Sequence, residues 1–252
     1  MTLFDTMGLL STVALTLPIF FMISTRLAWY KCFPAFLGYS VIILSFNFLS
    51  LGYIPASADV IHYHGLMNNL LDAPLILCFL TYFSQTAAFR KSLILCIGVF
   101  IAFEITVLLI AGLNKTSNTI IMAPGLLLVL LLAVIFFVHY VKLAIVNQKA
   151  LGKLLMVSSL LLAYVVYCFI YVEYYLLHTT FVSDTKLVYF LVTIFSSSLF
   201  CVGIIAEKRR VRHLAELHKT REELKALYGE EESNTTIPFE TVVFKFEKGN
   251  TY

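Results

Sequence analysis

Seven long apolar stretches follow one another along this chain, and they constrain its fold more than any other feature of the sequence. A transmembrane helix needs about 20 consecutive, mostly apolar residues, and each stretch is close to that length. Their ranges are 7–24, 33–53, 63–83, 92–113, 119–141, 154–177 and 187–206. Charged residues make up only 13% of the chain, against about 25% in soluble domains. The sequence therefore predicts an all-α, polytopic membrane protein with one bundle of seven transmembrane helices.

Positive charges are distributed unevenly between the two sets of connections. Basic residues follow the first, third, fifth and seventh stretches, whereas the other connections carry only Lys115 and Lys186. The first set is Arg26, Lys31, Arg90, Lys91, Lys142, Lys149, Lys153, Lys208, Arg209, Arg210 and Arg212. Because basic connections stay in the cytoplasm, we expect a multi-pass protein of the cell membrane with its N-terminus outside and its C-terminus in the cytoplasm. The same charges favour contact with membrane lipid over binding to nucleic acid.

The composition changes after Ala206, where Lys, Arg, Glu, Leu and Ala become frequent. These residue types favour helix. We expect a seven-helix transmembrane domain over 1–206, a cytoplasmic helical extension over 207–229 and a flexible cytoplasmic tail over 230–252. Two interpretations of the extension stay open: it is a simple continuation of the last helix, or it is a docking site for a cytoplasmic protein partner.

Three carboxyl groups fall within the apolar stretches, and no lysine or arginine accompanies them there. They belong to Asp72, Glu104 and Glu173. A charged side chain inside the membrane costs at least about 2.5–3.5 kcal/mol, so these acids need a compensating partner. A bound proton, a histidine, a metal ion, or a cationic or hydroxylated ligand would each serve.

The third stretch carries the densest set of polar residues. His64, Asn68 and Asp72 are spaced four apart, which places them on one face of a helix. Pro74 removes the usual backbone donor of the Leu70 carbonyl and predicts a bend beside them. The face is interpreted either as a ligand, proton or cation site, or as a hydrogen-bond cluster that holds helices together.

Two further patterns concern the acids. Glu104 and Asp72 lie at similar depths, and if they meet, repulsion would force one of them to hold a proton at neutral pH.

The sixth stretch carries a polar-tipped stripe on one helical face: Tyr164, Tyr167, Tyr171, Tyr174 and His178. The deeper tyrosines either bond the acids across the bundle or line a cavity. Packing is the expected role of Asn47, Thr193 and the serines at 196–198.

Several function classes lack their required residues. The candidates for metal ligands are His62, His64, Asp72, Glu104 and His178, but no recognised ligand motif connects them. On a helix, His62 and His64 would point apart. Retinal is rejected because a Schiff base needs a lysine within the last span, and residues 187–206 contain none. No cofactor is predicted.

The leading hypothesis is a receptor- or sensor-like protein that binds a small ligand, a lipid or a cation in an outward-facing polar pocket. The expected ligand-binding residues are His64, Asn68, Asp72, Glu104, Tyr171 and Glu173. The last helix would then report to a cytoplasmic partner. One alternative is an intramembrane enzyme, with or without a metal, that acts on a lipid. A second is a proton- or ion-coupled carrier. With no catalytic set identified, a binding role is favoured over an enzymatic one.

Overall fold

Seven α-helices account for most of the described chain. The computed structural model describes residues 3–146, 150–173 and 182–228. The helices are α1 (Leu3–Ser24), α2 (Phe33–Ser50), α3 (Ala58–Leu80), α4 (Ala87–Ala111), α5 (Lys115–Val146), α6 (Leu151–Tyr171) and α7 (Val182–Tyr228), with short 3₁₀ turns η1 (Leu27–Trp29) and η2 (Thr81–Phe83). All seven helices are long and apolar enough to cross a membrane, and the described residues contain no strand. The predicted all-α, seven-helix architecture is confirmed.

Local sequence signals set several helix ends. Ser57 accepts a hydrogen bond from the Val60 amide at the start of α3, and Thr86 accepts one from the Phe89 amide at the start of α4. Such caps satisfy backbone donors that the first helical turn leaves free. Gly112 ends α4 with a φ of 72°, a conformation that glycine adopts without steric cost.

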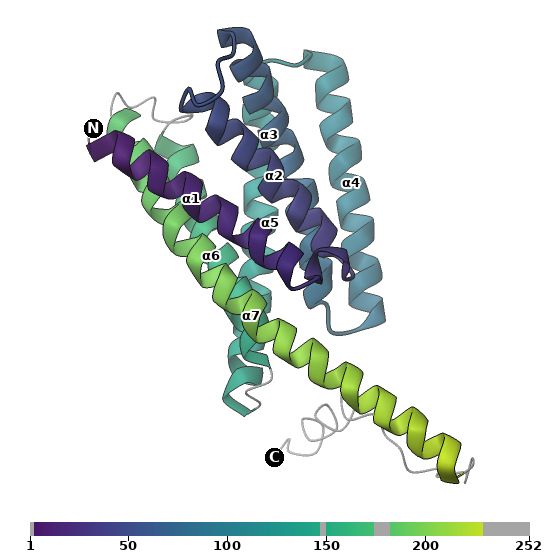
Figure 1. Ribbon diagram of the computed structural model, residues 1–252. Helices are drawn as coiled ribbons and strands as arrows, with labels where there is room; N and C mark the ends of the chain where they lie inside the picture. Colours follow the sequence, from purple (N-terminus) through teal and green to yellow (C-terminus); the bar gives the residue numbers. More distant parts are fainter. Residues whose placement is uncertain (1–2, 147–149, 174–181, 229–252) are drawn as a thin grey trace. The chain divides into compact units, whose positions relative to one another are not determined.

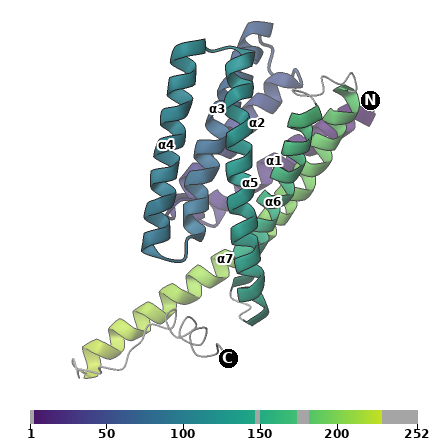
Figure 2. The ribbon, with the colours of Figure 1, turned by 180° about the vertical axis from the view of Figure 1, so that it is seen from behind.

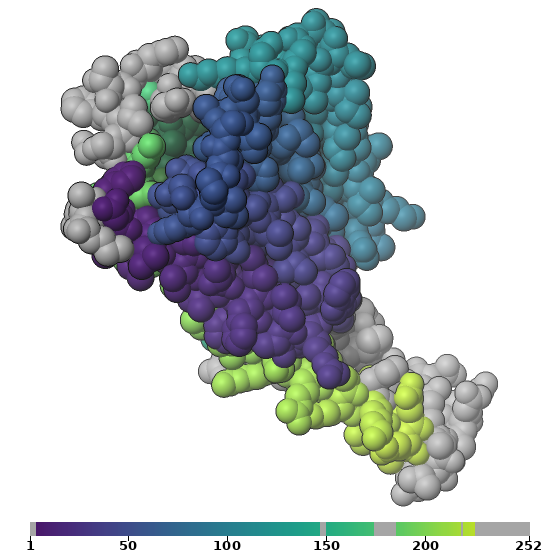
Figure 3. Space-filling model, turned by 45° about the horizontal axis from the view of Figure 1, so that its top comes forward, coloured from purple at the N-terminus to yellow at the C-terminus, as the bar shows by residue number. Residues whose placement is uncertain are grey.

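Consecutive helices run antiparallel within the bundle, joined by short connections (Figure 1). The helix α3 is the central member, because 56% of the residues in its 18-residue apolar stretch are buried. The helix α4 lies at the edge, and only 17% of the residues in its corresponding stretch are buried. The view from behind shows α4 beside α3 and α5 (Figure 2). The space-filling view shows α1 and α2 covering another face (Figure 3). Most of the α4 surface is therefore exposed at the edge of the bundle.

The helices α6 and α7 approach each other closely at two glycines. A Cβ atom added to Gly152 would lie 2.7 Å from the Glu207 backbone nitrogen, and one added to Gly203 would lie 2.7 Å from Met156 Cγ. Small residues allow this kind of backbone approach between membrane helices. The crossing holds α7 against α6 from Gly203 to Glu207.

A buried ionic cluster lies at this crossing. Glu207 is fully buried, and its Oε1 atom accepts hydrogen bonds from the Tyr82 hydroxyl and from Arg210, with Nη2 at 2.5 Å and Nε at 2.9 Å. Arg210 Nη2 also donates to the Tyr82 hydroxyl at 3.2 Å. The chain divides into two units, Met1–Arg210 and Val211–Tyr252, so both charged partners belong to the first unit.

Substituting Gly152 by alanine is expected to destabilise the protein by about 1–3 kcal/mol, because the new methyl group would displace the backbone at Glu207. Thermal unfolding of the purified protein measures the effect. Gly98 is the matched control, since nothing lies within 4 Å of the position of its Cβ atom. Gly98→Ala is expected to leave stability unchanged or to raise it by about 0.5–1 kcal/mol. Equal losses in the two variants would contradict the close crossing.

Candidate functional site

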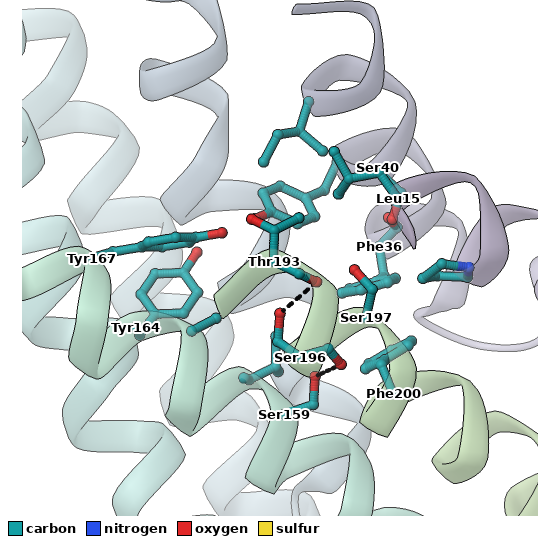
Figure 4. Close-up of a pocket in the computed structure, with 15 residues that line it drawn as sticks. Leu15, Phe36, Ser40, Ser159, Tyr164, Tyr167, Thr193, Ser196, Ser197 and Phe200 are labelled. Atoms are coloured by element: carbon teal, nitrogen blue, oxygen red, sulfur yellow. Dashed lines mark hydrogen bonds between the residues drawn. The ribbon is translucent and has the colours of Figure 1, made fainter. Parts of the chain in front are cut away.

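A small cavity lies within the bundle among residues of α1, α2, α6 and α7 (Figure 4). Its volume is about 40 Å³, which is room for a few water molecules. Sites for drug-sized ligands usually measure about 300–1,000 Å³. Eight of its 15 lining residues carry a hydroxyl group: Tyr39, Ser40, Ser159, Tyr164, Tyr167, Thr193, Ser196 and Ser197. The cavity therefore suits only a compact, polar ligand.

Helical spacing places these hydroxyl groups on inward faces. On α7, Thr193, Ser196, Ser197 and Phe200 recur at intervals of three and four and share one face. The Phe200 ring stacks on Phe36 of α2 with centroids 4.0 Å apart, which closes one side of the cavity. The serine-rich face of α7 was expected to serve packing, and here it also forms a cavity wall.

The cavity offers mainly hydrogen-bond acceptors. Ser40 donates to the Phe36 carbonyl at 2.8 Å, Ser159 to the Ser196 carbonyl at 2.7 Å, and Ser196 to the Thr193 carbonyl at 3.3 Å. A hydroxyl group has one hydrogen and two lone pairs, so these groups retain only acceptor capacity for a ligand. Thr193 Oγ1 is buried and makes no hydrogen bond of standard geometry, although the Tyr167 and Tyr189 hydroxyls lie near it. Such a lining favours a ligand that donates hydrogen bonds or carries positive charge.

Asp72 is joined to this wall through a tyrosine. The Tyr164 hydroxyl, on a fully buried side chain that lines the cavity, donates to Asp72 Oδ1 at 2.8 Å. We expected the deeper tyrosines of the sixth stretch either to bond an acid or to line a cavity. Tyr164 does both. The hydroxyls of Tyr39, Tyr167 and Tyr189 also lie within electrostatic range of Asp72. A carboxylate polarises its donor, so the Tyr164 oxygen becomes a stronger acceptor toward the cavity.

No basic group forms an ion pair with Asp72 among residues 3–146, 150–173 and 182–228. Tyr164 lies about 20 Å along α6 from Leu151, near the middle of a membrane about 30 Å thick. The described partner of Asp72 at this depth is therefore a neutral hydroxyl group. The charge of the carboxylate is left for a proton or a bound cation to balance.

Glu104 has different surroundings from Asp72. The buried residues of α4 are Leu93, Phe100 and Glu104, which lie along one face, and Phe100 reaches the Gly125 backbone of α5. Glu104 is 7% exposed, and its Oε1 atom is buried without a hydrogen-bond partner. In the part of the chain that the structure describes, no bond joins Glu104 to Asp72, whose carboxyl group bonds to α6 instead. The described hydrogen bonds therefore do not pair the two acids.

The other predicted ligand-binding residues also lie outside the lining of the cavity. His64 Nε2 pairs with the Ser45 hydroxyl at 2.9 Å and links α3 to α2, while the Tyr171 hydroxyl donates to the Thr119 carbonyl at 3.0 Å and links α6 to α5. Asn68 lies one turn from Asp72, and its Oδ1 atom is buried without a partner. Glu173 is half-buried just beyond α6. Among the candidate ligands, Asp72 is thus the one joined to the cavity, through Tyr164.

The metal-ligand candidates do not converge in the described ranges. There, no group of three His, Cys, Asp or Glu side chains is positioned to hold a metal ion. His62 is exposed and packs on Tyr63, whereas His64 is half-buried against Phe46 and Ser45. His178 and Tyr174 lie outside the described residues. No ligand set supports the metal-dependent alternative within the described residues.

Sequence reasoning missed two tyrosines and the role of a threonine. Tyr39 of α2 and Tyr189 of α7 are isolated tyrosines in apolar stretches, so no periodic pattern in the sequence connects them to Asp72. Thr193 carries a weak signal, since it starts the hydroxyl series that continues at Ser196. The chain matches no family model, no curated protein and no solved structure. Its function must therefore be inferred from the geometry of the site.

Proposed function

We propose that this protein is a receptor- or sensor-like seven-helix membrane protein that binds a compact cation in the cavity beside Tyr164. The observation that carries the proposal is a carboxylate at membrane depth, Asp72, bonded to a tyrosine that lines an acceptor-rich cavity. Positive charge in the cavity would offset the cost of holding the Asp72 carboxylate inside the membrane. The proposal places the ligand in the cavity within the bundle, whereas the sequence analysis expected an outward-facing pocket.

The chemistry of the lining indicates the class of cation. All polar side chains of the lining contribute oxygen, which suits alkali metal ions and small protonated amines. Thr193 Oγ1 is buried and makes no hydrogen bond of standard geometry, although the Tyr167 and Tyr189 hydroxyls lie near it. A bound ammonium group or metal ion would give this oxygen a well-aligned partner. The volume of about 40 Å³ excludes a lipid or a large amine from the cavity as it stands.

The helix α7 supports a receptor-like role over simple storage of an ion. It contributes Thr193, Ser196 and Phe200 to the cavity and runs on as one helix to Tyr228. Binding at Thr193 would therefore act on the same helix that supplies the region 207–229, the proposed docking site for a cytoplasmic protein. This proposal includes an N-terminus outside and a C-terminus in the cytoplasm of the cell membrane, from the positions of the basic residues.

Compact cations are expected to raise the thermal unfolding midpoint of the purified protein. The test compares chloride salts of sodium, potassium, ammonium and methylammonium with bulky N-methylglucamine at constant ionic strength. A ligand at a free concentration of 100 times its dissociation constant stabilises a protein by about 2.7 kcal/mol. Asp72→Asn is expected to abolish the cation response. Thr193→Val is expected to weaken the response, although this variant keeps the Asp72 carboxyl group.

Asp59→Asn is the matched control for this test, because Asp59 is an exposed acid at the start of the same helix. It is expected to keep the full cation response. A response that survives unchanged in Asp72→Asn, or no response to any compact cation, would refute the proposal. Cation-dependent flux into liposomes, lost in Asp72→Asn, would instead assign the cavity to an ion-coupled carrier.

A further inference from the structure

After Arg210, α7 carries an exposed apolar face. It consists of Leu214, Leu217 and Leu224, whose side chains are 42%, 43% and 48% exposed. An α-helix has 3.6 residues per turn, so these three side chains lie within about 80° of one another around the helix axis. A narrow apolar face on an otherwise polar helix is typical of a helix that packs against a partner. We call these three residues the leucine face.

The charges of this segment are arranged around the leucine face. Two exposed ion pairs lie on the opposite side of the helix: Arg212–Glu216 at 3.0 Å and Lys219–Glu223 at 3.7 Å. Arg221 is also exposed, but its position lies on the leucine face, between the second and third leucines. It takes part in neither of these ion pairs. A partner for this face should therefore supply apolar side chains and a carboxylate.

A second copy of the chain fits this description poorly. Two copies in one membrane have the same orientation, so their α7 helices would run parallel. Paired along the leucine face, they would place Arg221 against the same residue of the other copy. Like charges repel, and a basic residue within the apolar seam of two parallel helices reduces their stability. The position of Arg221 thus favours a different occupant.

Residues 237–247 of this chain have the required composition. They lie outside the described residues, and their sequence is Ile-Pro-Phe-Glu-Thr-Val-Val-Phe-Lys-Phe-Glu. Six large apolar side chains thus accompany the carboxylates of Glu240 and Glu247. Residues 229–252 contain five glutamates and two lysines, whereas residues 211–228 contain four lysines or arginines and three glutamates. The two segments therefore have net charges of opposite sign, which favours their association.

The connection between the two segments is long enough for them to meet. The helix α7 ends at Tyr228, and Leu214, the far end of the leucine face, lies about 21 Å back along it at 1.5 Å per residue. Residues 229–236 can span up to about 26 Å when extended. A segment tied to its binding face by so short a connection has an effective concentration in the millimolar range. Weak contacts are then sufficient for binding.

We infer that residues 237–247 bind the leucine face of α7, with their apolar side chains on the leucines and Glu240 paired with Arg221. The inference deepens the proposed function and rests on it in one respect, since that function makes 207–229 the docking site for a cytoplasmic protein. Residues 237–247 would cover this site, and the cytoplasmic protein would have to displace them.

Pulsed electron paramagnetic resonance tests the contact in the full chain in nanodiscs. Spin-labelled amino acids replace Ala215 and Thr241, and the distance between the labels is measured in N-methylglucamine chloride with no partner protein. A narrow distribution of short distances is expected, which should broaden and lengthen in Leu217→Glu/Leu224→Glu. The matched control is Arg212→Gln/Lys219→Gln, which changes the net charge equally on the opposite face and should keep the narrow distribution.

Reversal of the proposed ion pair provides a second measurement. Arg221→Glu should broaden the distribution, and Arg221→Glu/Glu240→Arg should restore it. A broad distribution in the wild type, equal broadening in the opposite-face control, or no rescue by the exchanged charges would overturn the inference. A short distance that disappears on dilution with unlabelled chain would overturn it as well, because the segment would then bind a second copy. Since no compact cation is present, failure of the cation site would leave these results unchanged.

Discussion

Replacing Glu207 by alanine is expected to destabilise the protein by about 3–5 kcal/mol. Glu207 is fully buried, and its removal would leave the Arg210 guanidinium without its carboxylate beside Tyr82. The Arg210 side chain is only 16% exposed, so its unpaired guanidinium would recover little of its hydration. Unfolding of the purified protein by heat or denaturant, followed by circular dichroism, measures the loss.

The same helix supplies a matched control for Glu207. Glu216 pairs with Arg212 at 3.0 Å, but these side chains are 60% and 79% exposed. Glu216→Ala is expected to cost less than about 0.5 kcal/mol, because exposed ion pairs contribute little. The double variant Glu207→Leu/Arg210→Met should recover much of the loss, since it leaves no buried charge unpaired. If Glu207→Ala is as mild as Glu216→Ala, the buried cluster does not hold α7 in place.

Tyr164→Phe is expected to cost about 1.5–3 kcal/mol, the range for hydrogen bonds to charged groups. The variant removes only the hydroxyl group that donates to Asp72 Oδ1 at 2.8 Å and leaves the ring in its buried place. In an Asp72→Asn background, the same change should cost only about 0.5–1.5 kcal/mol, because the acceptor is then neutral. The difference between the two losses measures the coupling between Asp72 and Tyr164.

Tyr171→Phe controls for the general effect of losing a tyrosine hydroxyl from α6. Its hydroxyl donates to the Thr119 carbonyl, away from Asp72. Its loss should be the same in wild-type and Asp72→Asn backgrounds, because sites without shared partners contribute independently. A Tyr164→Phe effect that is equally independent of Asp72 would contradict the hydrogen bond between them.

The fold was largely predictable from the sequence, because hydrophobic length alone defines membrane spans. Each of the seven predicted stretches overlaps one observed helix, from α1 to α7. The helix ends were less predictable. In particular, α7 begins at Val182, ahead of the predicted start at residue 187.

The site was predictable only in part. Spacing identified Asp72 and Tyr164 as inward polar residues, but helix pairing in the bundle decides which acid each tyrosine meets, and spacing does not reveal pairing. Glu207 looks like the first residue of a charged extension, but its carboxylate is buried against Tyr82 and Arg210, and Gly152 lets α6 approach its backbone. Asp72 and Glu104 have similar predicted depths, yet Asp72 bonds to Tyr164 of α6 and no hydrogen bond between the two acids is described.

Difference infrared spectroscopy with and without a compact cation, on protein carrying ¹³C-labelled aspartate, tests the cation site most directly. Binding beside Tyr164 should change the environment of the Asp72 carboxyl group, since the two are hydrogen-bonded. We therefore predict a cation-dependent carboxyl band that disappears in Asp72→Asn and weakens in Thr193→Val. A carboxyl spectrum that stays unchanged at saturating sodium, potassium, ammonium and methylammonium would contradict a cation site in this cavity.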